Sequence, residues 1–391
     1  MASPPPRSPP SFAPASQRIY GLDILRACAI LCVLFLHSSL LLDGYPALCK
    51  VLTAVPDGVS MFFVLSGYLI GMLLLRRVTQ PEFGLREALD FWLRRWLRTL
   101  PAYYLVLVLV YFIAVRGGQP PPVRLPDYIF FVQNLAWPHP GFFGEAWSLA
   151  VEEWFYLLLP LPPLIAARLW PRLPRDRLLL AWAALCLVGA PLFRASLAGA
   201  HGIATPDWDL WLRKIVLVRM DAPAFGVLGA WLHTFRPRLW QRHARTAFAA
   251  GIALLIAQRL LLTAFDPAWY MNYAYLSLDC AGFLLLLPAL SALHTGSGPA
   301  YRFVRLFSTL AYGLYLVHFN LVLMNVLPRL AYFYLPVQPA AFGSAMMYLG
   351  FWSLSLLLAA LLHLCWEKPF MQWRDRRLRR EPALDLCRIA A

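Results

Sequence analysis

Charged residues are scarce in this sequence of 391 residues. Asp, Glu, Lys and Arg together account for 14% of it, whereas hydrophobic residues account for 60% and the mean hydropathy is +0.59. This balance excludes an ordinary soluble globular protein and indicates a polytopic membrane protein. The net charge of +15 would suit a nucleic-acid partner, but the basic residues lie between apolar runs. We therefore interpret them as signals of membrane topology and predict no nucleic-acid partner.

Lysine and paired cysteines are also nearly missing. Lysine occurs only at Lys50, Lys214 and Lys368, and the other basic residues are arginine, which codon bias explains as well as phosphate binding does. The seven cysteines form no CxxC motif, and most fall inside apolar runs, where cysteine behaves as a small hydrophobic residue. The sequence therefore predicts neither a disulfide framework nor a metal site.

Apolar runs long enough to cross a bilayer recur about ten times. A membrane-spanning helix needs about 20 consecutive apolar residues. The sequence thus predicts an all-α integral membrane protein, a polytopic bundle of about ten transmembrane helices. The runs lie near residues 20–42, 57–75, 91–115, 145–167, 178–198, 213–233, 246–264, 273–294, 306–328 and 344–366.

The distribution of basic residues predicts the orientation of this bundle. With a cytoplasmic N-terminus and ten spans, 25 basic residues fall in cytoplasmic segments and 7 in external ones, as the positive-inside rule requires. Both termini are then cytoplasmic. Residues 1–18, rich in Pro and Ser, are expected to form a disordered tail without a cleavable signal, and residues 371–391 a basic tail, with no soluble domain appended.

The first predicted span carries three ionisable residues, Asp23, Arg26 and His37. Arg26 and His37 are eleven residues apart, so at ~100° and ~1.5 Å per residue they share one helix face and lie roughly 16 Å apart. We expect His37 near the middle of the bilayer and Arg26 near its boundary. Asp23 is expected to pair with Arg26 at a spacing of three residues. Ionisable residues within a span indicate a functional site, although a lone histidine can also serve as a hydrogen bond between helices.

Further charged residues cluster at the start of the third and fourth spans. Arg95 and Arg98 open the third span, where they either anchor the helix at the headgroups or bind phosphate through their guanidinium groups. Glu145, Glu152 and Glu153 lie near the start of the fourth span, and the last two cannot both face one partner.

The later spans carry polar residues for which packing is the favoured interpretation. Arg219 and Asp221 are expected to be charges buried in the bundle. We expect His318 to be structural, and Tyr312 and Tyr315 to serve packing. The small residues of the second span, GVSMFFVLSGYLIG, favour close helix approach. A proline-rich external segment, near residues 116–144, is either a cover for an outward-facing cavity or a plain connection.

Seven motifs in order resemble the acyltransferase 3 family of membrane acyltransferases. They are LDILRACAILCVLFLHS, FFVLSGYLI, RRWLRTLPAYY, WSLAVEEWFYLLLP, RMDAPAFG, YGLYLVH and EKP. The resemblance extends from about residue 20 to residue 370, and we take residues 19–370 as the membrane domain. The sequence departs from the family at Trp154, where many members have Gln, and it lacks the hydrolase-like domain that some members append.

The resemblance implies transfer of an acyl group, most simply acetyl, from cytoplasmic acyl-CoA to a hydroxyl of a sugar, cell-envelope glycan or glycosylated metabolite at the cell membrane. His37 is then the expected general base, because its ordinary pKa of ~6.5 suits proton transfer near neutral pH. Arg26 would guide the CoA end or stabilise charge, and Glu152 would orient the site or assist proton transfer. Arg95 and Arg98 would bind the CoA phosphates. No metal is expected.

Two other classes of function compete with this interpretation. A transporter or flippase would also contain buried charges and about ten spans, but such proteins often show internal repeats, and we find no convincing repeat here. A sensor or scaffold with a degenerate site is disfavoured by Arg26, His37, Arg95 and Arg98, all of which are present.

For an acyltransferase, two mechanisms are possible, an acyl-enzyme and a ternary complex. We favour the ternary complex, because no second activated nucleophile is evident.

Overall fold

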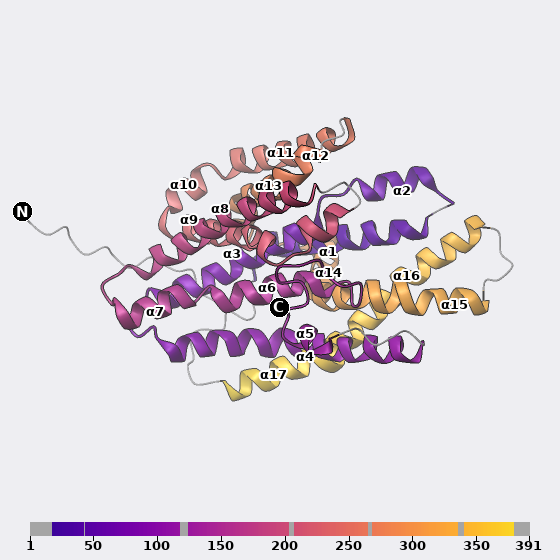
Figure 1. The fold of residues 1–391 in the computed structure, drawn as a ribbon, viewed down its shortest axis with the longest axis horizontal. Helices are drawn as coiled ribbons and strands as arrows, with labels where there is room; N and C mark the ends of the chain where they lie inside the picture. Colours follow the sequence, from indigo (N-terminus) through magenta and orange to yellow (C-terminus); the bar gives the residue numbers. More distant parts are fainter. Residues whose placement is uncertain are drawn as a thin grey trace, which may run out of the picture.

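The computed structural model describes residues 18–42, 44–117, 124–202, 207–264, 268–334 and 340–378, and these form helices and connections without a strand. The long helices run roughly along the long axis of the molecule (Figure 1). The predicted all-α fold is therefore confirmed, whereas most of the two predicted tails lies outside the described residues. The α-helices are α1 (Tyr20–Ser38), α2 (Pro46–Thr53), α3 (Gly58–Val78), α4 (Leu85–Arg116), α5 (Leu125–Ile129), α6 (Ala146–Leu158), α7 (Leu161–Leu169), α8 (Arg175–His201), α9 (Asp221–Phe235), α10 (Pro237–Arg242), α11 (Ala244–Ala264), α12 (Ala268–Tyr273), α13 (Tyr275–Ser291), α14 (Gly298–Val317), α15 (Leu327–Tyr334), α16 (Ala340–Leu362) and α17 (Lys368–Arg377).

Eight helical segments of the described chain are long and apolar enough to cross a membrane, and α13 is a shorter apolar helix. This composition identifies a multi-pass membrane protein. The number of ten spans and the orientation of the termini remain predictions. The eight segments are Tyr20–Leu41, Pro46–Val78, Leu85–Arg116, Ala146–Leu169, Arg175–His201, Ala244–Leu262, Gly298–Tyr332 and Phe342–Arg377.

The predicted span near 213–233 is wrong at its beginning. A π turn covers Asp209–Arg213, a 3-10 turn covers Leu217–Arg219, and α9 begins only at Asp221. The reason is electrostatic, because Arg213 forms ion pairs with Asp57 and Asp209 at 2.9 Å and is thereby held outside the helix. The apolar run therefore folds as a short buried helix preceded by two tight turns.

Close packing of α3 against α9 depends on glycine, as the second span predicts. A Cβ at Gly67 would collide with the backbone carbonyl of Pro223, and a Cβ at Gly226 with that of Val64. Gly58 faces α1 in the same way, against the carbonyl of Ala29. The small residues thus bring three helix backbones together, and they place α1 beside α3 in the middle of the bundle.

The charges predicted to be buried in the bundle are buried, and their partners lie on other helices. Arg219 and Asp221 are both 0% exposed. Arg219 donates to the hydroxyl of Ser60 at 2.6 Å, and Asp221 pairs with Arg194 of α8 at 2.9 Å. Arg194 is itself 1% exposed, so this ion pair is buried on both sides.

The described part of the external segment packs onto the bundle and does not extend freely from it. A short helix, α5, forms there despite the prolines, because Pro126 occupies one of its first two positions. Trp154, the departure from the family pattern, donates to the carbonyl of Phe131 at 2.9 Å and so holds this segment down. His139 is buried there, and desolvation lowers its pKa to about 3, which leaves this ring neutral near pH 7.

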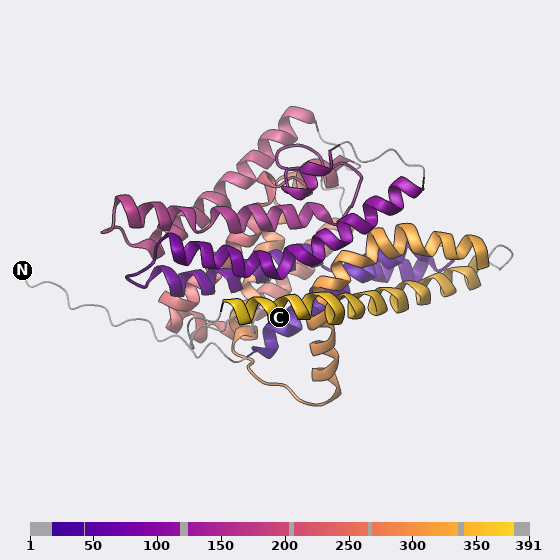
Figure 2. The ribbon, with the colours of Figure 1, turned by 90° about the horizontal axis from the view of Figure 1, so that it is seen from below.

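The C-terminal helices brace the helix that carries the predicted arginine pair. α16, the π turn His363–Glu367 and α17 follow one another without a break, and they run beside α4 (Figure 2). Arg374 of α17 donates to the carbonyl of Arg94 at 3.2 Å, and Trp366 donates to that of Pro101 at 2.9 Å. These bonds fix the position of α4 on both sides of Arg95 and Arg98.

Candidate active site

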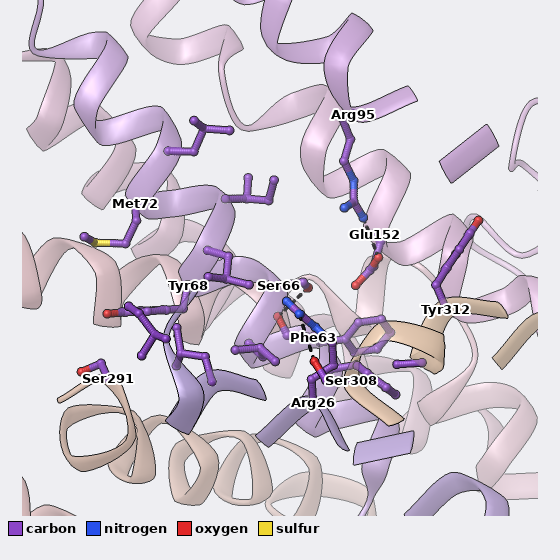
Figure 3. Close-up of a pocket in the computed structure, with 18 of the residues that line it drawn as sticks. Arg26, Phe63, Ser66, Tyr68, Met72, Arg95, Glu152, Ser291, Ser308 and Tyr312 are labelled. Carbon is purple, nitrogen blue, oxygen red and sulfur yellow. Dashed lines mark hydrogen bonds and ion pairs between the residues drawn. The ribbon is translucent and has the colours of Figure 1, made fainter. Parts of the chain in front are cut away.

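A cavity of about 690 Å³ brings together four of the five predicted site residues. Arg26 enters it from α1, Arg95 from α4 and Glu152 from α6 (Figure 3). Arg98, also on α4, lines it too. We call this space the arginine cavity. His37 does not line it. The predicted phosphate-binding residues and the predicted base therefore belong to neighbouring but separate parts of the structure.

Arg26 is held by a polar network at one side of the arginine cavity. Its guanidinium lies 3.5 Å from the carboxylate of Asp23, so the predicted pair is confirmed. It also donates to Ser308 of α14 at 3.4 Å, as the dashed line in Figure 3 shows. Arg18 contacts Asp23 at 3.0 Å, and Ser308 donates to the same carboxylate at 2.6 Å. One buried acid thus balances two arginines and ties α1 to α14.

Glu152 pairs with Arg95, not with His37. The two side chains form an ion pair of 2.9 Å across the cavity wall (Figure 3), and the guanidinium of Arg95 also lies 4.3 Å from the ring centre of Tyr156. Glu153 instead accepts from Thr99 at 3.2 Å, so the two acids do take different partners, as expected. Arg26, Arg95 and Glu152 are close enough to interact electrostatically. The cavity therefore concentrates positive charge and partly balances it.

His37 lies in the last turn of α1, and its closest polar neighbour is another histidine. Its Nδ1 is 2.8 Å from Nε2 of His318, and the ring centres are 5.0 Å apart with an angle of 24° between the planes. Phe319 packs against the other side, with ring centres 4.7 Å apart. We call His37 and His318 the histidine pair. α1 ends one residue after His37, and the 3-10 turn Ser39–Leu41 continues it. The expected position of His37 near mid-bilayer stays a prediction.

Tyr315 and Ser148 lie between the arginine cavity and the histidine pair. Both line the cavity, and their hydroxyls are 2.5 Å apart. The ring of Tyr315 is 5.9 Å from that of His318. Behind them, the carboxylate of Glu145 accepts from the backbone N–H and the side-chain amide of Asn320, at 2.7 and 2.6 Å. One tyrosine side chain therefore separates the cavity from the histidines.

Sequence reasoning missed the partnership of His318 and the positions of Tyr315 and Ser308. A signal was present, because Tyr312, Tyr315 and His318 recur every three residues and so lie on neighbouring faces where α14 passes into the π turn. Which helix this face meets is not encoded in its spacing. Contacts between residues 281 positions apart, such as His37 and His318, follow from tertiary packing alone.

Comparisons with known proteins agree with these features. The model of a family described as an acyltransferase domain, acyltransferase 3, matches residues 19–366. The O-acetyltransferase OatA of Staphylococcus aureus is 32% identical over 155 residues, and the Bacillus subtilis protein named "Putative peptidoglycan O-acetyltransferase YrhL" is 34% identical over 161 residues. These matches cover 36% and 37% of this chain, and the chain spans about a quarter of each relative, 24% and 23%.

No solved structure matches the chain. The family match extends over nearly the whole membrane bundle, from the start of α1 to the π turn before α17. This chain therefore belongs to the acyltransferase 3 family.

Proposed function

We propose that this protein is a membrane O-acyltransferase that moves an acetyl or other short acyl group from cytoplasmic acyl-CoA to a hydroxyl of a sugar or glycan. The relatives named as O-acetyltransferases, one of them for peptidoglycan, support both the acyl group and the class of acceptor. The observation that carries the proposal is the meeting of Arg26, Arg95, Arg98 and Glu152 around one cavity next to the histidine pair.

In this proposal the arginine cavity binds the donor. Acyl-CoA carries three phosphate groups, and guanidinium groups bind phosphate oxygens through paired, charge-assisted hydrogen bonds. Glu152 holds Arg95 at 2.9 Å and thereby fixes the direction of its guanidinium before the ligand arrives. Most of the remaining lining is apolar, including Phe62, Leu65 and Leu69, which suits the thin pantetheine arm.

His37 accepts the proton of the acceptor hydroxyl. The thioester reaches it past Tyr315 and Ser148, which line the cavity and bond to each other. A neutral imidazole is a suitable base for a hydroxyl that attacks a thioester carbonyl. His37 is partly exposed at the end of α1, so an acceptor on the side opposite the arginine cavity can approach it. Two substrates therefore approach one histidine from two sides, which is the arrangement of a ternary complex.

The test is a transfer assay with purified protein in lipid vesicles. Acetyl-CoA labelled in the acetyl group is supplied together with a soluble glycan acceptor. We expect free CoA and labelled acceptor to appear in equal amounts. Passage of label across the vesicle without release of CoA would show a transporter, and binding of acetyl-CoA without either event would show a sensor.

A further inference from the structure

His318 is held in one protonation pattern by the backbone of its own helix. Its Nδ1 lies 2.9 Å from the carbonyl oxygen of Leu314 and 2.9 Å from that of Tyr315. Carbonyl oxygens only accept hydrogen bonds, so Nδ1 must carry a hydrogen atom. The arrangement arises because α14 passes into the π turn His318–Val326 at this residue. His318 therefore donates to its own helix from Nδ1.

The other nitrogen of His318 must then accept a hydrogen bond. His318 is 0% exposed, and the hydrogen bonds of its ring among the described residues go to two carbonyls and to His37. A positive charge on this ring would be buried without a carboxylate bonded to it, which is costly, so the ring is neutral. A neutral imidazole with its hydrogen atom on Nδ1 has a lone pair on Nε2. The 2.8 Å contact thus requires Nδ1 of His37 to be the donor.

The tautomer of His37 follows from this chain of hydrogen bonds. With its hydrogen atom on Nδ1, neutral His37 has its free lone pair on Nε2. The contacts of the ring with His318 and Phe319, at 5.0 and 4.7 Å between centres, hold it in this orientation.

We infer that His318 is a positioning residue that fixes His37 in the Nδ1–H tautomer and so makes Nε2 the atom that accepts the proton. The inference rests on the proposed role of His37 as general base. The acceptor hydroxyl gives its proton to Nε2 while its oxygen bonds to the thioester carbonyl carbon. The carbon–sulfur bond then breaks, and the departing CoA thiolate takes the proton from Nε2. The products are the ester and CoA thiol, and His37 and His318 return to their initial state.

His318 also stabilises the intermediate state of this cycle. When Nε2 of His37 is protonated, the ring carries a positive charge, and its Nδ1–H donates a stronger hydrogen bond to Nε2 of His318. The same relation holds in other enzymes where a buried partner orients a catalytic histidine, and loss of the correct tautomer there reduces the rate by about 10⁴.

Two substitutions of similar size separate this role from a structural one. The side-chain amide of His318→Gln reaches the position of Nε2 and presents an oxygen that accepts from His37. The amide of His318→Asn reaches only the position of Nδ1, so it retains the bond to the backbone and loses the acceptor. We expect the Gln variant to retain kcat within about tenfold. The Asn variant should lose about 10²–10⁴-fold in kcat with the KM for acyl-CoA unchanged. His243→Asn, at an exposed histidine, is the control and should behave as wild type.

Nitrogen NMR of protein labelled at histidine with ¹⁵N supplies the readout that a merely structural role would not change. The signals of His37 are assigned by their loss in His37→Gln. We expect an unprotonated Nε2 and a protonated Nδ1 in wild type and in His318→Gln, and a mixture of tautomers in His318→Asn. Full activity of His318→Asn, equal losses in both variants, or an unchanged His37 tautomer in His318→Asn would overturn the inference. Retained transfer in His37→Gln would instead overturn the role of His37 as the base, and no transfer by the wild-type protein would overturn the proposed function.

Discussion

The arginine cavity and the histidine pair hold their polar groups in different ways. In the cavity, charged residues from three helices are balanced by ion pairs, such as Arg95 with Glu152 and Arg26 with Asp23. In the histidine pair, two rings are joined by one hydrogen bond, and backbone carbonyls fix the ring of His318. A charged, spacious cavity suits binding of an anionic donor, whereas a neutral, oriented imidazole suits proton transfer. The difference supports our proposal that binding and chemistry occupy adjacent parts of one site.

The largest expected effect on the transfer rate is that of a substitution in the histidine pair. His37→Gln retains hydrogen bonding but cannot serve as a base of suitable pKa, so we expect the transfer rate to fall by about 10²–10⁴. Rates are measured from CoA release with purified protein. Binding of acyl-CoA should persist, because His37 does not line the arginine cavity. If His37→Gln transfers at nearly the wild-type rate, His37 is structural and the histidine pair takes no part in the chemistry.

A second prediction compares two Asp–Arg pairs, one buried and one exposed. Asp23→Asn leaves Arg18 and Arg26 without their acid, and breaking a buried pair costs about 3–5 kcal/mol in the free energy of unfolding. We expect a clear fall in the thermal unfolding midpoint in detergent. Asp127→Asn is the control, because its partner Arg124 is 75% exposed and such pairs contribute about 0–1 kcal/mol. Equal midpoints for the two variants would show that Asp23 is not needed to hold Arg26.

The third prediction concerns donor binding by Arg98. Arg98→Ala removes a guanidinium from the cavity and should raise the KM for acyl-CoA, since a hydrogen bond to a charged group contributes about 1.5–3 kcal/mol. We expect kcat at saturation and the KM for the acceptor to stay close to wild type. Arg98→Lys should recover only part of the affinity, because a lysine lacks the planar fork.

Arg86→Ala, an exposed position on the same helix outside the cavity lining, is the matched control and should leave the KM unchanged. A parallel loss of protein and activity in Arg98→Ala, without a change in KM, would support a role for Arg98 as a membrane anchor.

The smallest expected effect is at the boundary between the two regions. Tyr315→Phe removes the hydroxyl that bonds to Ser148 at 2.5 Å. A neutral hydrogen bond contributes about 0.5–1.5 kcal/mol, so we expect a small loss of stability and transfer within about tenfold of wild type. Stability is measured by thermal unfolding, and transfer is measured by CoA release. A loss as large as that of His37→Gln would place the Tyr315 hydroxyl in the chemistry.

Much of the fold follows from the sequence because apolar run length and the spacing of small residues are local features. The close approach at Gly67 and the Asp23–Arg26 pair were predictable for this reason. The start of α9 was not, because Arg213 is held outside the helix by Asp57, a residue 156 positions away.

The candidate site was predictable in part for the same reason. The residue types of the arginine cavity could be identified from ionisable side chains in apolar runs and from a family resemblance. Their pairing could not, because the partner of Glu152 is Arg95, a residue 57 positions away on another helix. His318 looked structural because a histidine on a helix face shows its function only when its partner is known.

The most direct test measures donor binding and acyl transfer in parallel for one variant of the histidine pair and one variant of the arginine cavity. Equilibrium binding of acyl-CoA and the rate of CoA release at saturating donor are determined for His37→Gln and Arg98→Ala in the same lipid. If the two regions divide the work as we propose, His37→Gln binds donor as wild type does and transfers about 10²–10⁴ times more slowly. Arg98→Ala binds weakly and transfers at nearly the wild-type rate once saturated. Two variants that lose binding and transfer together, or in the opposite order, would contradict this division.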